Sequence, residues 1–118
     1  MTHHTSEHRD PAMNDCIDNC GHCHATCLET INYCLGQGGK HADPKHIAMM
    51  AACADICVTS ADTMLRGATV HAAVCGACAE VCRQCAMSCE AFGDDADMKR
   101  CAEACRRCAG SCAAMARM

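Results

Sequence analysis

The sequence predicts an all-α fold: an antiparallel, up-down-up-down four-helix bundle with a Cys-lined core. Two observations lead to this prediction. Cysteines recur at steps of three, four or seven residues within each of four segments, and turn-forming residues separate the segments. Ile, Leu, Val and Phe together supply only 12 of the 118 residues, whereas Cys supplies 16. Because alternating steps of three and four place side chains on one face of a helix, the thiols must themselves fill the interior.

Helix-starting and helix-ending residues divide the chain into four parts of similar length. Pro11 and Pro44 each follow an aspartate, and Thr69 and Asp94 or Asp95 are expected to cap the other two helices. The expected helices span 11–35, 44–66, 70–91 and 95–116, with a glycine within two residues of the end of each of the first three. Short second and third connections favour antiparallel neighbours. Residues 1–10 are expected to form a flexible, His-bearing tail, and residues 11–118 the bundle domain.

The cysteines form one inward face on each expected helix, an a/d seam of a heptad pattern. The first helix carries Cys16, Cys20, Cys23, Cys27 and Cys34. The second carries only Cys53 and Cys57, and its seam continues through His46, Met50, Ser60 and Met64. The third carries Cys75, Cys78, Cys82, Cys85 and Cys89, preceded by His71. The fourth carries Cys101, Cys105, Cys108 and Cys112, between Met98 and Met115.

Antiparallel stacking of these seams predicts six layers of side chains, two of them made of thiols alone. In order along the bundle, the predicted layers are Met13/Met64/His71/Met115, Cys16/Ser60/Cys75/Cys112, Cys20/Cys57/Cys78/Cys108, Cys23/Cys53/Cys82/Cys105, Cys27/Met50/Cys85/Cys101 and Cys34/His46/Cys89/Met98. The sequence therefore predicts a column of sulfur that ends in Met and His at both ends.

An interior of thiols indicates metal binding, and soft sulfur ligands favour Cu(I). Cu(I) accepts two or three sulfurs and one thiolate can bridge two ions, so ligand counting predicts multiple Cu(I) ions, on the order of one per Cys. Zinc needs discrete tetrahedral sets, which the two all-thiol layers offer, so a zinc-thiolate protein stays an alternative. A core that uses Cys only as a small hydrophobe, a disulfide lattice and an iron–sulfur cluster are each less favoured.

Candidate ligands other than cysteine lie toward the ends of the predicted column. His71 and Met64 are candidates at one end, where Met residues either admit the metal or simply plug the bundle. His46 and Met50 are candidates toward the other end. A copper-delivery chaperone remains a second alternative, although a chaperone typically exposes one site and this chain is expected to bury many.

Composition excludes several other functions. The chain has no basic run or aromatic platform for nucleic acid, and no stretch of 18 uninterrupted apolar residues for a membrane. No nucleotide-binding loop or catalytic set of side chains suggests an enzyme. The polar start of the chain lacks a leader-like apolar segment, so we expect a cytoplasmic protein, where reducing conditions favour thiolates over disulfides.

A second apolar stripe lies beside the cysteine face. On the first helix it includes Ile17, Leu28, Ile31 and Leu35, and on the third it includes Val70, Val74 and Val81. It either widens the core face or packs between bundles in an oligomer. The scarcity of other hydrophobic residues supports the oligomer.

Three segments of the chain resemble the bacterial copper storage proteins, which are four-helix bundles with cysteine-lined interiors. The segments are CGACAEVCRQC at 75–85, CAEACRRC at 101–108 and CIDNCGHCHATC at 16–27, and the resemblance covers residues 12–116. It implies a Cu(I)-storing homotetramer of the cytosolic type. The second helix departs from this pattern, because it has two cysteines and places His46, Met50 and Met64 along its seam.

Overall fold

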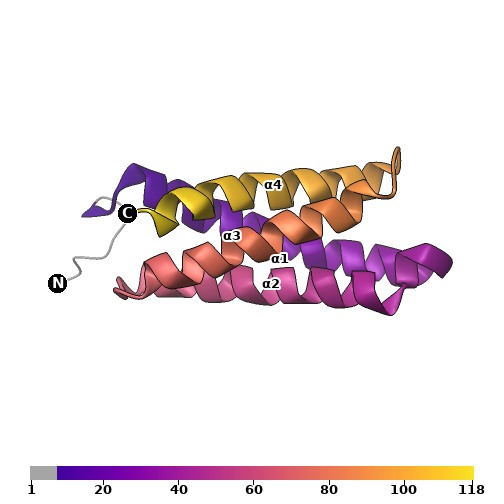
Figure 1. Cartoon of the computed structure of the whole chain (residues 1–118), viewed down its shortest axis with the longest axis horizontal. Helices are drawn as coiled ribbons and strands as arrows, with labels where there is room; N and C mark the ends of the chain where they lie inside the picture. Colours follow the sequence, from indigo (N-terminus) through magenta and orange to yellow (C-terminus); the bar gives the residue numbers. More distant parts are fainter. Residues whose placement is uncertain (1–7) are drawn as a thin grey trace.

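The fold is an antiparallel four-helix bundle (Figure 1), seen in a computed structural model that describes residues 8–118. The helices are α1 (Pro11–Gln37), α2 (Pro44–Leu65), α3 (His71–Glu90) and α4 (Ala96–Ala116), and the 3-10 turn η2 (Gly39–Ala42) lies between the first two. Helix α1 packs against α2 and α4, and α3 packs against the same two helices. The result is a rod of 51 × 25 × 21 Å, so the fold class predicted from the sequence is confirmed.

All helix ends lie within two residues of the predicted boundaries. Two details of the helix ends differ from the prediction. Helix α1 continues past Gly36 and ends at Gln37, and its C-cap residue is Gly38, whose φ of 72° is left-handed and whose N–H donates to Cys34 O. The prediction that Thr69 caps α3 is wrong, because the N-cap residue is Val70 and no side chain caps it. A tight turn joins α2 to α3 instead, with a backbone hydrogen bond from His71 N to Ala68 O.

Aspartates cap two of the four helices. The side chain of Asp10 accepts a hydrogen bond from Ala12 N at 2.8 Å, beside the proline that begins α1. The side chain of Asp95 accepts from the backbone N–H groups of Asp97 and Met98 at the start of α4. Asp43 stands at the N-cap of α2 but makes no such bond. Helix α4 is thus tied to Asp95, a residue that also has partners on other elements.

The core of the bundle is made of sulfur. All sixteen cysteines are buried and free, and four methionines complete the column: Met50, Met64, Met98 and Met115. Partly buried aliphatic residues such as Ile17, Ile31 and Val81 pack around it. The expectation that thiols replace an ordinary hydrophobic core is therefore confirmed.

Helix α2 also has the length and apolar composition of a membrane span, with a mean hydropathy of 1.3 over its best window. Length and composition alone are weak evidence, because core helices of soluble proteins pass the same test. Here α2 packs between α1 and α3 and directs Cys53 and Cys57 into the core.

Candidate metal centre

The thiols of the bundle meet in the layers that the seams predict. In the layer of Cys16, its Sγ lies 3.5 Å from that of Cys112, and Ser60 Oγ lies 3.4 Å from Cys75 Sγ. In the next layer, Cys57 Sγ lies 3.9 Å from Cys78 Sγ and 3.7 Å from Cys108 Sγ. Cys108 Sγ also lies 3.6 Å from the Sγ of Cys20 on α1, so this layer includes a thiol from each of the four helices.

The following layers continue the same register. Cys53 Sγ lies 3.7 Å from Cys23, 3.6 Å from Cys82 and 3.9 Å from Cys105. Cys27 lies 3.9 Å from Cys101. Contacts of similar length join successive layers, for example Cys57 to Cys82 at 3.6 Å. The predicted order of the four layers from Cys16 to Cys27 is therefore confirmed, and their sulfurs form one connected column.

The closest thiols form four groups of metal-binding size. Within each group all Sγ atoms lie within 4.8 Å of one another: Cys20/Cys78/Cys108/Cys112, Cys23/Cys53/Cys57/Cys82, Cys23/Cys27/Cys53/Cys105 and Cys57/Cys78/Cys82/Cys108. The groups share members, so that Cys57, for example, belongs to two of them. An ion bonded at about 2.3 Å to two sulfurs holds them about 3.8 Å apart at a tetrahedral angle and about 4.6 Å apart in a line. Small outward shifts of the thiols are enough to admit ions between them.

Burial and neighbouring thiols set the protonation of the column. Burial raises the pKa of Cys75, and raises that of Cys34 to about 11. The thiols of Cys101 and Cys85, together with burial, raise the pKa of Cys89. S–H donors act in the opposite direction at Cys53, where Cys105 lowers the pKa by hydrogen bonding to the thiolate. A thiolate is thus stabilised by protonated neighbours, while burial opposes many thiolates without metal.

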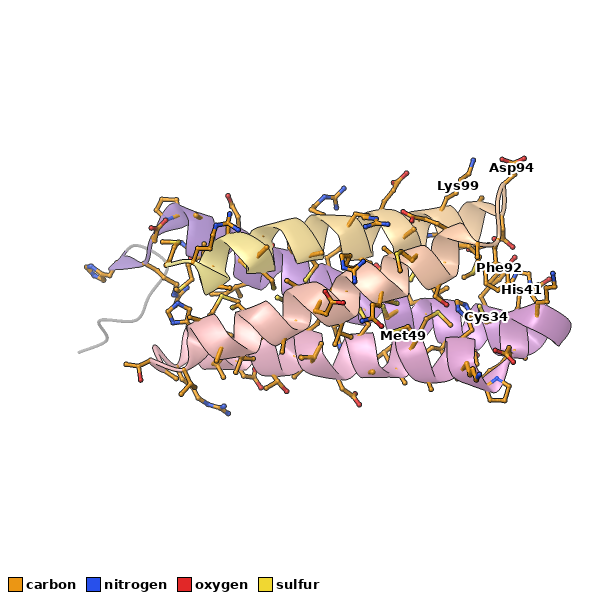
Figure 2. All side chains as sticks on the ribbon, viewed as in Figure 1. Cys34, His41, Met49, Phe92, Asp94 and Lys99 are labelled. Carbon is orange, nitrogen blue, oxygen red and sulfur yellow. The ribbon has the colours of Figure 1, made fainter. Side chains whose placement is uncertain are left out.

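At the end opposite the C-terminus, where Figure 2 labels Cys34, the column finishes in three different ligand types: a thiol, an imidazole and a thioether. Cys34 Sγ lies 3.7 Å from His46 Nε2 and 3.5 Å from Met98 Sδ. The other ring nitrogen, His46 Nδ1, lies 2.7 Å from Ser88 Oγ. His46 is only 5% exposed, and burial lowers its pKa, so the imidazole is neutral at physiological pH.

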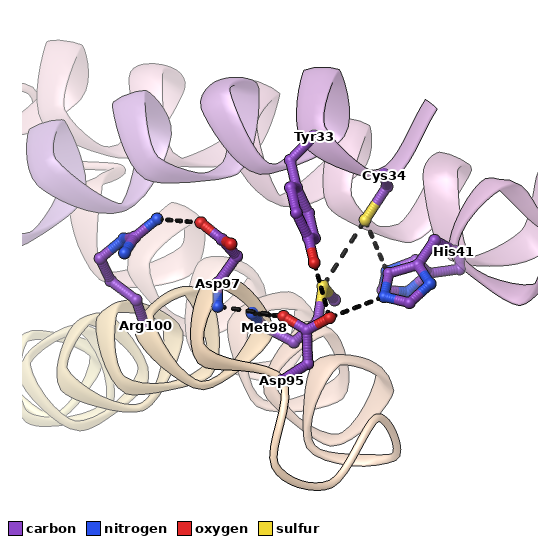
Figure 3. Close-up of polar contacts among 8 residues, drawn as sticks. Tyr33, Cys34, His41, Asp95, Asp97, Met98 and Arg100 are labelled. Carbon is purple, nitrogen blue, oxygen red and sulfur yellow. Dashed lines mark hydrogen bonds and ion pairs between the residues drawn. The ribbon is translucent and has the colours of Figure 1, made fainter. Parts of the chain in front are cut away.

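A polar network covers this end (Figure 3). Tyr33 donates its hydroxyl hydrogen to Asp95 Oδ2 at 2.7 Å, and His41 Nε2 lies 2.9 Å from the same oxygen. The ring of Phe92 packs against those of His41 and His46, with centroids 4.4 and 4.8 Å apart. The hydrogen bonds from Tyr33 and His41 lower the pKa of Asp95 to about 2. The network, which we call the latch (Tyr33, His41, Phe92, Asp95), ties η2 to the start of α4.

The other end of the column contains the imidazole of His71. His71 Nδ1 lies 3.2 Å from Ala68 O, whereas Nε2 is the one buried side-chain nitrogen or oxygen of residues 8–118 without a hydrogen-bond partner. Met64 and Met115, which the register places in the same layer, are buried, and Met13 is half-buried. An imidazole nitrogen is therefore available at this end.

The candidates named from the sequence fall at both ends and along the column. Met50, which the register places in the layer of Cys27 and Cys101, is fully buried, and Thr30 interrupts the thiols of α1 and donates its hydroxyl hydrogen to Thr26 O. Ser88 and the latch were missed, because none of them lies on a cysteine seam. The tail histidines His3 and His4 lie outside the described residues, and His8 is exposed.

The sequence pattern that defines the copper storage proteins matches residues 9–117 of this chain. The chain belongs to the copper storage protein family. Its cysteines line a four-helix bundle as binding sites for multiple Cu(I) ions, and the family is one of storage proteins, not of enzymes. No curated protein sequence matches the chain.

Solved structures support this membership. The Nmul_A1745 protein of Nitrosospira multiformis is 44% identical, with a TM-score of 0.86 over 92% of this chain and 98% of its own. Cu(I)-bound copper storage protein BsCsp3 is 30% identical, with a TM-score of 0.82 over 89% and 98%. A cytosolic copper storage protein from Streptomyces lividans, with five coppers, is 31% identical, with a TM-score of 0.79 over 91% and 93%. The copper storage protein Ccsp from Streptomyces lividans, loaded with 10 copper equivalents, is 32% identical, with a TM-score of 0.78 over 90% of this chain and 84% of its own.

Proposed function

We propose that this chain stores Cu(I) in the cytoplasm at a capacity on the order of one ion per Cys. The observation that carries this proposal is the sharing of thiols between neighbouring four-sulfur groups. A shared sulfur can bridge two ions, so the column accommodates a continuous cluster instead of separate sites. The S. lividans Ccsp with 10 copper equivalents supports a large capacity, and the S. lividans relative described as cytosolic supports the cytoplasmic location.

The proposed ligands are the sixteen cysteines together with four residues toward the ends of the column. His71 and Met64 form a port, where the unpaired Nε2 of His71 offers a first soft contact to an arriving ion. The ion then passes inward by exchanging one thiolate for the next, because successive Sγ atoms lie 4.0 Å apart or less. Met50 and His46 serve as ligands farther along the column.

Charge balance favours a monovalent ion. Each Cu(I) that replaces a thiol proton leaves the buried interior near neutral, whereas a divalent ion at the same stoichiometry would leave a large uncompensated positive charge. We therefore expect about one proton released per Cu(I) bound near neutral pH. Calorimetric titration in two buffers of different ionisation enthalpy measures this ratio. Zero net release would contradict the proposed exchange.

Zinc binding is the second candidate, because the four-thiol groups suit a tetrahedral ion. Because the groups share cysteines, at most two of them can each hold a zinc ion at the same time. One such pair is Cys20/Cys78/Cys108/Cys112 with Cys23/Cys53/Cys57/Cys82. Two such zinc ions would use half of the cysteines and leave the rest without metal. A copper-delivery chaperone is disfavoured by burial, since every cysteine is enclosed in the bundle.

One titration separates these functions. The reduced protein is titrated with buffered Cu(I) under anaerobic conditions, desalted and analysed for metal, and a parallel sample is titrated with zinc. We expect a capacity on the order of the number of cysteines for Cu(I) and about two ions for zinc. A Cu(I) capacity of one or two ions would contradict storage and favour a chaperone.

We also propose that the chain forms a homotetramer through the apolar stripe of α1. Leu28 and Leu35 are 48% and 58% exposed there, although aliphatic residues are scarce in this chain. Light scattering after size exclusion should give the mass of four chains. The double substitution Leu28→Asp with Leu35→Asp should reduce it, whereas Leu65→Asp, at the end of α2, serves as a matched control.

A further inference from the structure

Cys34 is set apart from the shared thiols of the column. Among residues 8–118, its polar contacts are to an imidazole, His46 Nε2, and to a thioether, Met98 Sδ, and not to another thiol. Thr30 occupies the seam position between Cys27 and Cys34 and turns its hydroxyl to the backbone. The position that would have continued the thiols of α1 to Cys34 therefore carries a group that is no Cu(I) ligand.

The imidazole beside Cys34 is held in one orientation. Ser88 Oγ lies 2.7 Å from His46 Nδ1 and can accept its hydrogen, which leaves the lone pair on Nε2 facing Cys34. A hydrogen bond to the second nitrogen is how proteins fix the tautomer of a metal-binding histidine. Phe92 packs on the ring and restricts it further. His46 is thus arranged as a ligand before any metal arrives.

We propose that Cys34, His46 and Met98 form a mononuclear Cu(I) site with one thiolate, one imidazole and one thioether. The inference rests on the proposed storage of Cu(I) and adds Met98 as a ligand and Ser88 as a positioning residue. On binding, the S–H bond of Cys34 breaks and its proton leaves, a bond from Sγ to Cu(I) forms, and His46 Nε2 and Met98 Sδ donate lone pairs. No electron is transferred, and the single thiolate balances the single positive charge.

The three ligand atoms are spaced for such an ion. With metal–sulfur bonds of about 2.3 Å and metal–nitrogen bonds of about 2.0 Å, trigonal coordination separates sulfur from nitrogen by about 3.7 Å and sulfur from sulfur by about 4.0 Å. The corresponding separations in the structure are 3.7 Å from Cys34 to His46 and 3.5 Å from Cys34 to Met98. The first separation already fits, and the second is about 0.5 Å short, an adjustment that the flexible Met side chain can make.

The site is tested by nuclear magnetic resonance of the full chain, loaded anaerobically with buffered Cu(I). Methyl-labelled methionine and nitrogen-labelled histidine are used, with Met98 assigned from Met98→Leu. We expect the Met98 methyl resonance to shift on loading and His46 Nε2 to move to the position of a metal-bound imidazole nitrogen. The methyl resonance of Met87, which is exposed on α3, should stay in place as a control.

Substitution of the positioning residue gives a second readout. Ser88→Ala leaves all three ligands in place but removes the partner of Nδ1, so we expect Cu(I) affinity at this site to fall about 10–100-fold. The affinity is followed through the Met98 methyl resonance in competition with a Cu(I) chelator. Thr59→Ala also removes a side-chain hydroxyl, but from an exposed position thirteen residues along α2 from His46, and should leave this affinity within about twofold of the unaltered protein.

The outcomes separate this inference from the proposed function. Unchanged Met98 and His46 resonances at a total capacity near one ion per Cys would overturn the mixed site and leave storage intact. Shifted resonances at a total capacity of one or two ions would support the mixed site and overturn storage. Equal affinities for Ser88→Ala and Thr59→Ala would overturn the role of Ser88.

Discussion

The two ends of the bundle hold their histidines in opposite ways. At the end formed by the α2–α3 turn, the buried His71 Nε2 has no hydrogen-bond partner among residues 8–118, and the register of the helices places Met64 and Met115 in the same layer. At the end formed by η2 and the α3–α4 connection, both nitrogens of His46 are engaged, and the latch ties the surrounding elements together. Both ends therefore contain Met and His, but they differ in hydrogen bonding. We call the His71 end, with its unpartnered imidazole nitrogen, the open end, and the His46 end, where both ring nitrogens have partners, the closed end.

This difference suggests that the two ends have different tasks. An unpaired imidazole beside flexible thioethers can capture an ion and pass it on, because no existing interaction has to be broken. At the other end, we expect the imidazole of His46 to bind an ion that arrives along the column, while the latch excludes water from this end. We expect loading through the His71 end and closure at the Cys34 end.

The largest expected effect concerns the rate of loading. His71→Gln combined with Met64→Leu should slow Cu(I) uptake about tenfold, because the first ligands are lost, and should leave the total capacity nearly unchanged. Stopped-flow mixing with a coloured Cu(I)–chelator complex measures the rate. His46→Gln is the matched control at the closed end and should load at nearly the rate of the unaltered protein. Slower loading by the control than by the double variant would reverse the assignment of the two ends.

A smaller effect is expected from acid on the latch. Asp95 has a pKa of about 2 in the folded chain and an ordinary value of 3.8, so its hydrogen bonds stabilise the fold above about pH 4. This stabilisation is lost as the pH falls from about 4 to 2. Asp95→Asn keeps a helix-capping side chain but loses the carboxylate that Tyr33 and His41 share.

Thermal unfolding of the reduced, metal-free protein tests whether the stabilisation by Asp95 is lost as the pH falls. Asp95→Asn should melt a few degrees below the unaltered protein at pH 7, and the difference should close toward pH 2. Tyr33→Phe, which removes one of the two donors, should give a smaller difference with the same pH dependence. A difference that stays constant from pH 7 to 2 would show that the carboxylate does not stabilise the closed end.

The smallest effect is a change in capacity by single ions. Thr30→Cys should place a thiol between Cys27 and Cys34, join Cys34 to the column and raise the Cu(I) capacity by about one ion. Ser60→Cys is the counterpart near the open end, where Ser60 already contacts Cys75 and Cys112. Metal analysis after saturation and desalting measures both. Unchanged capacity in both variants would show that the column is not limited by its thiols.

The sequence predicted the core of this structure better than its ends. Steps of three and four residues fix which side chains of a helix point inward, so all sixteen cysteines and their layers followed from spacing and antiparallel stacking. The latch depends instead on the path of the connections, which brings Tyr33 and His41 to Asp95 across more than fifty residues of chain. Ser88 was missed for a related reason, since it lies beside the seam of α3 and matters only through its contact with His46.

Anomalous scattering at the copper absorption edge, from crystals loaded to saturation, tests the central claim most directly. The structure predicts a row of Cu(I) ions along the bundle axis between the layer of Cys16 and that of Cys89, most of them bound by two or three sulfurs that neighbouring ions share. In the last of these layers, one ion should lie between Cys34, His46 and Met98, and share no thiolate with the rest of the row. Copper confined to the surface, or held only in separate four-sulfur sites with no shared thiolate, would contradict this account.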